Sequence, residues 1–253
     1  MKNIKKKFKI NITTYCFFLL AFLCGYFKNV IYIFLIVFLH ELGHVLAIKF
    51  FKYKVIQVEL FPFGGITKID KPINSSTNKE FIIAISGVTI QFILAIILVY
   101  FKPNDYTLIN TYNNIILLFN LLPIIPLDGS IIMHTFLEKF FSYQKAFFFY
   151  QLISFSFFIL FLIYNIFYPI DNYFICMVLL IQFLIVLKNK KYLLNRFYLE
   201  RMLYSFPYKK IENNFDNNIS SLKKETRHFF YQKDHYLSEK EMLSKSIFSS
   251  LKY

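Results

Sequence analysis

Six long apolar stretches constrain this chain more than any other feature. Hydrophobic residues make up 57% of the sequence and the mean hydropathy is +0.47, which is far more apolar than a soluble domain. A helix that crosses about 30 Å of hydrocarbon needs about 20 residues. The sequence therefore predicts an all-α polytopic membrane protein with about six transmembrane helices. The predicted spans lie near residues 10–27, 30–48, 81–101, 112–132, 146–167 and 173–187.

The basic residues indicate how these spans are oriented. With six spans, every lysine and arginine except Lys28 and Lys102 falls on one side, together with both termini. Because basic residues favour the cytosolic side, both termini are predicted to be cytosolic. The first stretch is interpreted as a retained span, since no small-residue cleavage site follows it. The net charge of +14 is then explained by topology and by anionic lipid head groups, and no nucleic acid partner is expected.

Two histidines and a glutamate lie inside the second apolar stretch, in the sequence His40-Glu41-Leu42-Gly43-His44. On a helix, imidazoles four positions apart face the same side and can share a zinc ion. Glu41 beside them can accept a proton from a water molecule at the metal. Ionisable groups at membrane depth are costly and usually functional. The motif therefore predicts a zinc site with Glu41 as its general base.

A zinc site of this kind needs a third protein ligand. Asp128 is the favoured candidate because it is the only carboxylate embedded in another apolar stretch. Pro123 and Pro126 precede it and should unwind the fourth span at that point. Asp128 could instead cap the helix that follows, and His134 is a competing ligand. In some membrane metalloproteases the third ligand is instead a glutamate, and Glu80 and Glu138 are the candidates for such a ligand here. The identity of the third ligand therefore stays open.

The two motifs together resemble the site-2 protease family of intramembrane zinc metalloproteases. The resemblance rests on His40-Glu41-Leu42-Gly43-His44 and, about eighty residues later, on Asn120-Leu-Leu-Pro-Ile-Ile-Pro-Leu-Asp128-Gly129. The six spans, the segment Glu59–Gly65 and the C-terminal tail are similar to the sporulation subgroup of that family. Members of this subgroup release a sigma factor from a membrane-associated precursor. The resemblance covers the chain well to about Leu187.

The resemblance implies a role for each matching residue. It implies Zn²⁺ bound by His40, His44 and Asp128, with Glu41 as the general base. It further implies a short re-entrant β-hairpin that offers an extended edge to a substrate strand. The residues that would place the substrate backbone are Asn120, Phe63, Gly64 and Gly65.

The third core helix departs from the family pattern. Many members carry Gly-Pro-x-x-Asn there, whereas this chain reads Gly87-Val-Thr-Ile-Gln91, with the proline replaced and glutamine in place of asparagine. No role is therefore assigned to Gln91 from the sequence, and the predicted zinc ligands are unaffected.

The tail differs in composition from the rest of the chain. Residues 188–253 are charged and rich in asparagine and lysine, so two domains are expected: a transmembrane metalloprotease domain, 1–187, and a cytosolic tail, 188–253. Relatives in the sporulation subgroup carry a nucleotide-sensing domain of the cystathionine-beta-synthase (CBS) type here. The tail is interpreted either as a degenerate half of such a unit or as a basic segment lying on the membrane. The cysteines Cys16, Cys24 and Cys176 have no metal-ligand spacing and are expected to pack in or near the spans.

Two functions are therefore weighed. The first is a zinc endopeptidase that cleaves a membrane-associated regulatory protein, which the resemblance implies to be a sporulation sigma-factor precursor. Membrane inhibitor proteins are further partners that the resemblance implies. The expected location is the bacterial cell membrane, in particular the mother-cell membrane around the forespore. The second is an ion or proton-coupled transporter that uses the buried His, Glu and Asp side chains, against which no internal repeat is visible.

Overall fold

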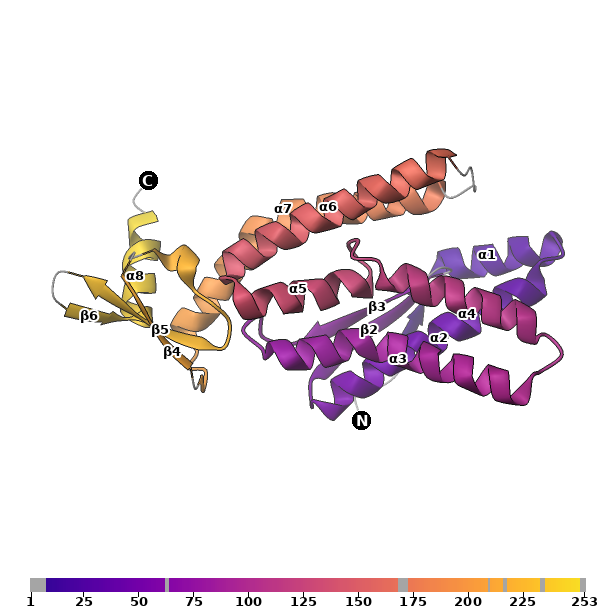
Figure 1. The fold of residues 1–253 in the computed structure, drawn as a ribbon, viewed down its shortest axis with the longest axis horizontal. Helices are drawn as coiled ribbons and strands as arrows, with labels where there is room; N and C mark the ends of the chain where they lie inside the picture. The colour runs from indigo at the N-terminus through magenta and orange to yellow at the C-terminus, as the bar shows by residue number, and fades with distance from the viewer. Residues whose placement is uncertain are drawn as a thin grey trace. The chain divides into compact units, whose positions relative to one another are not determined.

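The chain is mostly helical in a computed structural model (Figure 1). Four of the described helices are long and apolar enough to cross a membrane: α2 (Phe27–Phe50), α3 (Thr77–Phe101), α6 (Tyr143–Phe167) and α7 (Tyr173–Leu203). The prediction of a polytopic helical membrane protein is confirmed. The structure describes residues 8–61, 64–167, 173–208, 210–215, 218–232 and 235–250.

The chain divides into two compact units, each of which is described by itself. The first unit comprises residues 1–71 and 82–122, and the second comprises residues 72–81 and 123–253. The boundary near residue 81 falls within α3, so this helix contributes its first turn to the second unit and the rest to the first.

Helices α1 (Ile12–Leu23), α2 and α4 (Tyr106–Leu121), with most of α3, form the helical part of the first unit. A short turn joins α1 to α2, as the spacing of the first two apolar stretches predicts. Gly25 in this turn has φ +79°, a conformation that glycine adopts without the steric cost of a side chain. Helix α1 has 12 residues and is shorter than the apolar stretch that contains it.

The first unit also contains a three-stranded sheet. Strands β2 (Lys54–Phe61) and β3 (Gly64–Asp70) form an antiparallel hairpin, and β1 (Phe8–Ile10) pairs with β2 in parallel. The strand order is β1-β2-β3, so β3 lies at one edge of this sheet. A hairpin was expected at this position, but the expectation of an otherwise all-α chain was incomplete, because a second sheet occurs in the tail.

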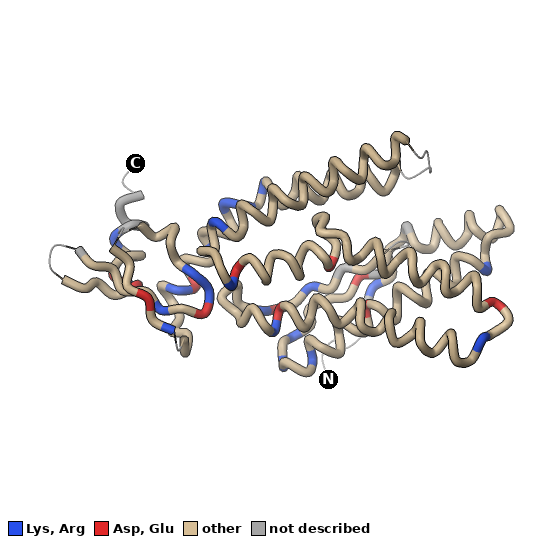
Figure 2. The backbone as a smooth tube through the Cα atoms, viewed as in Figure 1, with Lys and Arg blue, Asp and Glu red and all other residues tan. Residues whose placement is uncertain are grey.

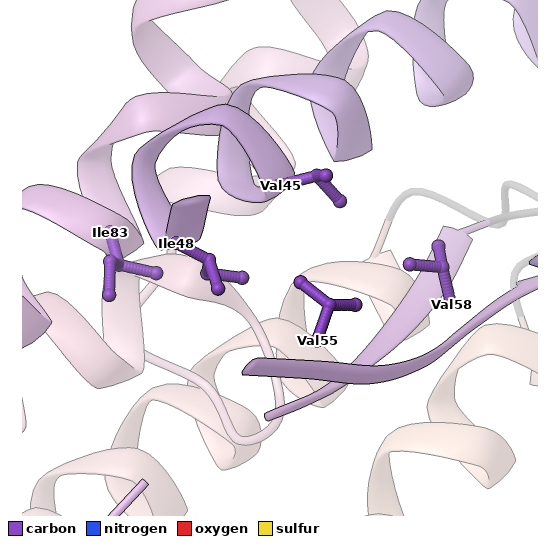
Figure 3. Packing of buried hydrophobic residues seen from close by; sticks show 5 residues of the cluster. All are labelled: Val45, Ile48, Val55, Val58 and Ile83. Carbon is purple, nitrogen blue, oxygen red and sulfur yellow. The ribbon is translucent and has the colours of Figure 1, made fainter. Parts of the chain in front are cut away.

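Aliphatic side chains hold the hairpin against the helices. Val45 and Ile48 from the end of α2, Val55 and Val58 from β2, and Ile83 from α3 form one buried cluster (Figure 3). Ile48 and Val58 are fully buried. Because Val55 and Val58 lie on either side of an irregularity in the β2–β3 register, both point to the helical face. The hairpin is therefore seated on the half of α2 that carries the histidines.

The fourth apolar stretch is two helices rather than one. Helix α4 ends at Leu121 and α5 begins at Asp128 and runs to Phe140. Pro123 and Pro126 explain the break, because proline has no backbone donor and its ring clashes with a preceding helical turn. Within the second unit, the Ser154 hydroxyl of α6 accepts a hydrogen bond from the Ile125 amide at 2.8 Å, which satisfies one backbone group of the unwound segment.

Helices α6 and α7 run side by side in the second unit (Figure 1). Their apolar parts carry no acidic or basic side chain, and the basic residues of α7 gather beyond Leu187 (Figure 2). Helix α7 does not end with its apolar part but continues to Leu203.

The described part of the tail is folded. It contains β4 (Lys210–Asn214), a 3-10 turn (Ile219–Ser221), β5 (Thr226–Gln232), β6 (His235–Ser238) and α8 (Glu239–Ser250). Strand β5 lies between β4, which is parallel to it, and β6, which is antiparallel. A buried cluster joins this sheet and α8 to the start of α6 and the end of α7. Its members are Tyr143, Phe197, Leu222, Phe230 and Leu243.

A buried ion cluster also fixes the tail within the second unit. The Lys224 amine lies 2.9 Å from the Glu138 carboxylate and 3.3 Å from both oxygens of Glu80. Burial lowers the pKa of Lys224, but the charges of Glu138 and Glu80 outweigh burial and raise its pKa above the ordinary value, so the amine stays charged at neutral pH. The next residue, Glu225, accepts a hydrogen bond from the Thr77 amide in the first turn of α3.

Candidate metal centre

His40 and His44 lie one helical turn apart on α2 and are buried. Their Nε2 atoms are 3.0 Å apart. The Nδ1 atom of His40 lies 2.9 Å from the side-chain oxygen of Gln91, and the Nδ1 atom of His44 lies 2.8 Å from the carbonyl oxygen of Ile83. Because both of these partners are acceptors, each Nδ1 carries the proton and donates it. Each Nε2 then presents a lone pair toward the other ring.

This arrangement fits a metal ion. Zinc binds imidazole nitrogen at about 2.0–2.1 Å in tetrahedral geometry, which places two nitrogen ligands roughly 3.3 Å apart. The observed Nε2 separation of 3.0 Å is close to that value. Two lone pairs facing each other in a buried site repel, and a shared cation removes the repulsion. A hydrogen-bonded Nδ1 is also the usual outer partner of a metal-binding histidine, since it fixes the ring and raises its basicity.

Two glycines allow α3 to approach the histidines closely. A Cβ atom at Gly87 would lie 2.5 Å from Nε2 of His44 and 2.7 Å from Nε2 of His40. A Cβ atom at Gly43 would lie 2.6 Å from the carbonyl oxygen of Ser86. Rotating one side chain would relieve neither clash. The clash at Gly87 involves both histidine rings, and the clash at Gly43 involves the backbone of α3. Small residues at this crossing therefore let α3 cover the histidine face of α2.

Gln91 is a site residue to which the sequence analysis assigned no role. Its side chain is fully buried and its oxygen contacts His40. Two sequence signals concern it. It stands where many family members carry asparagine, and it follows Gly87 by four residues, which places both residues on one face of α3. Asn113 on α4 donates to the backbone oxygen of Gln91 at 3.0 Å, so the segment of α3 behind His40 is itself held in place.

Glu41 lies beside the histidines and is held by the hairpin. Its side chain is buried, and the Thr67 hydroxyl of β3 donates a hydrogen bond to its Oε2 at 3.0 Å. A Cβ atom at Gly65 would lie 2.5 Å from the carboxyl carbon of Glu41. The carboxylate therefore rests directly on the bare backbone of β3. Thr67 was not singled out by the sequence.

The other predicted residues are placed as follows. Gly64 and Gly65 begin β3, whereas Phe63 lies outside the described residues. Asn120 is partly buried near the end of α4. Asp128 is the first residue of α5, in the second unit, where the amide groups of a helix N-terminus favour a carboxylate.

The competing ligands take part in other interactions. Glu80 and Glu138 hold Lys224 in the buried ion cluster of the second unit. His134 lies 3.7 Å from Glu138 and its ring packs 4.5 Å from that of Tyr150. Glu80 and Glu138 therefore form ion pairs with Lys224.

Comparisons with known proteins agree with this site. Residues 28–103 match the sequence profile of Peptidase family M50. Stage IV sporulation protein FB of Bacillus subtilis is 36% identical over 134 residues, which are 50% of this chain and 46% of that protein. A zinc metalloprotease of Methanocaldococcus jannaschii is 34% identical over 125 residues, 46% of this chain and 36% of that protein. The matched part thus spans less than half the length of either curated relative.

A solved structure extends the similarity. The site-2 protease from Methanocaldococcus jannaschii aligns with a TM-score of 0.55 at 26% sequence identity, and the alignment covers 73% of this chain and 90% of that chain. The region matched by the profile includes the histidine pair, Glu41 and the α3 residues that contact them. Residues 28–103 are therefore similar to Peptidase family M50, and the fold is similar to that of a site-2 protease.

Proposed function

We propose that this chain is an intramembrane zinc endopeptidase. The observation that carries the proposal is the buried His40–His44 pair on an apolar helix, with its two Nε2 atoms 3.0 Å apart and Glu41 beside it. Zinc in this site would supply a Lewis acid that lowers the pKa of water and polarises the scissile carbonyl. Glu41 accepts the proton of the attacking water and passes it to the departing amine.

Asp128 is the proposed third ligand. It follows a proline-interrupted segment that leaves the helical path, and it is the first residue of α5. Its carboxylate suits zinc, and three protein ligands leave the fourth position for water. The alternatives Glu80 and Glu138 are already paired with Lys224, which favours Asp128.

The hairpin is the proposed substrate-binding element. Among the described strands of its sheet, β3 lies at an edge and contacts Glu41 through Thr67 and Gly65. An extended substrate segment that pairs with this edge would expose its carbonyl groups, which a helical segment hides. Within this proposal Phe63, Gly64, Gly65 and Asn120 place the substrate backbone, and the hairpin re-enters the membrane.

The proposed substrate is a membrane-associated regulatory protein, namely a sporulation sigma-factor precursor. The support is the 36% identity to a protein named for stage IV of sporulation. The membrane inhibitor proteins implied by the resemblance stay a prediction. We further propose six spans with both termini in the cytosol of the bacterial mother cell, which charge-based orientation supports. Reporter fusions after Tyr253 and within the loop around Lys102 should report opposite sides.

Co-expression in a bacterial host with a sigma-factor precursor from the same genome tests the function. The wild-type chain and a matched variant, Glu241→Gln on the exposed face of α8, should both shorten the precursor on a blot. Glu41→Gln should not. A shortened precursor with Glu41→Gln would overturn the proposed base. Ion flux into sealed vesicles without cleavage of the precursor would instead favour a transporter.

A further inference from the structure

We infer that Thr67 is a positioning residue for the general base, so that the hairpin orients Glu41 as well as offering an edge to the substrate. The inference deepens the proposed function and rests on it. It starts from one contact, the hydrogen bond of 3.0 Å from the Thr67 hydroxyl to Oε2 of Glu41.

The contact comes from two separate elements. Glu41 lies on α2, and Thr67 pairs with Val58 of β2 in the middle of the hairpin. Side chains alternate along a strand, so Gly65 and Thr67 share the face of β3 that meets Glu41. Gly65 supplies space for the carboxyl group, and Thr67 supplies a donor at its end. Residue 65 thus admits the carboxylate and residue 67 fixes its direction.

The hydrogen bond divides the roles of the two carboxylate oxygens. Oε2 accepts from Thr67, which leaves Oε1 for the proton of the attacking water. A flexible glutamate that rotates about its side-chain bonds would spend much of its time facing away from that water. A proton acceptor must lie within hydrogen-bond reach of the proton that it removes. The Thr67 hydroxyl therefore acts on the catalytic step through Glu41.

Three variants of the full chain, purified in detergent, test this role against the same sigma-factor precursor. Thr67→Val keeps the shape and removes the hydroxyl, and it should lower kcat about 10- to 100-fold with KM unchanged, the range expected for a lost hydrogen bond to a charged group. Thr67→Ser keeps the hydroxyl and should restore kcat. Thr89→Val, whose hydroxyl bonds its own helix at Ile85, should match the wild type. Wild-type kcat in Thr67→Val would overturn the inference.

Testing Thr67→Val in a Glu41→Asp chain distinguishes a positioning role of Thr67 from a purely structural one. Glu41→Asp is one methylene shorter and no longer reaches Thr67, so Thr67→Val should cause no further loss in that background. If Thr67 only stabilised the fold, Thr67→Val would reduce the residual activity in both backgrounds. Zinc content should be unchanged in Thr67→Val, and a loss of zinc would also contradict the inference.

Cross-linking provides a readout that needs no cleavage. In a chain without its native cysteines, a short bifunctional thiol reagent should bridge Glu41→Cys and Thr67→Cys. It should not bridge Glu41→Cys and Lys68→Cys, because Lys68 points to the other face of β3. A bridge to residue 68 but not to residue 67 would overturn the geometry. If the pair at 41 and 67 is bridged but the wild-type chain cuts nothing, the proposed function fails and the hairpin contact stands.

Discussion

Gly87 of α3 lies directly against the ring of His44, so that a single added methyl group at residue 87 would sit 2.5 Å from Nε2. Gly87→Ala should therefore displace a ring or the helix and abolish zinc retention by the purified protein. Elemental analysis of zinc per chain measures this. Gly64→Ala is the matched control, since no atom of the described residues lies within 4 Å of a Cβ atom there, and it should retain zinc. Full zinc content in Gly87→Ala would contradict the observed packing.

Gln91 fixes the ring of His40 and should tune the affinity for the metal. Gln91→Leu removes the acceptor of the His40 Nδ1 proton. Loss of such an outer partner typically weakens metal binding by about 10- to 100-fold. Competition with a zinc chelator measures the dissociation constant. Gln91→Glu keeps an acceptor and should bind zinc more tightly than Gln91→Leu. Equal affinities for the two variants would show that the contact between Gln91 and His40 does not affect zinc binding.

Substitutions of Asp128 and of Glu138 should have opposite effects on zinc binding. Asp128→Ala should lose zinc because it removes the proposed third ligand. Glu138→Gln should retain zinc, since Glu138 is occupied by Lys224 in the second unit. Zinc analysis of the two purified variants distinguishes them, and the reverse pattern would identify a glutamate site instead.

Lys224 is buried and its neighbour Lys223 is at the surface, so replacing each should lower the stability of the protein by a different amount. Lys224→Met removes the buried amine that pairs with Glu80 and Glu138, and breaking a buried pair in this way costs about 3–5 kcal/mol. Its neighbour Lys223 pairs with Glu212 at the surface, so Lys223→Met should cost at most about 1 kcal/mol. Thermal unfolding followed by circular dichroism in detergent compares the two. Equal melting temperatures would show that the buried cluster contributes little.

The sequence predicted what local spacing determines. His40 and His44 are four residues apart on a helix, and that spacing alone brings their rings together. Pro123 likewise fixes a helix end through its own covalent geometry. These features needed no knowledge of the rest of the fold.

Contacts between elements that are distant in the sequence could not be predicted from the sequence pattern. Gln91 and Thr67 meet the site only because α3 and β3 pack against α2. Lys224 is one lysine in a basic tail, and nothing near it in the sequence distinguishes it from a solvated lysine. The strand pairing of the second sheet was not predicted for the same reason, since the parallel β4–β5 pairing depends on how the chain returns after the turn at Ile219.

The ion cluster of the second unit also has a consequence for biosynthesis. Lys224 follows Glu80 by 144 residues, so a ribosome releases the first turn of α3 long before it makes the lysine that neutralises it. Until then Glu80 and Glu138 lack the Lys224 amine, and the Thr77 amide lacks the Glu225 carboxylate. The membrane helices are therefore inserted as an unfinished assembly, which becomes complete only when the last part of the chain has been synthesised and folds.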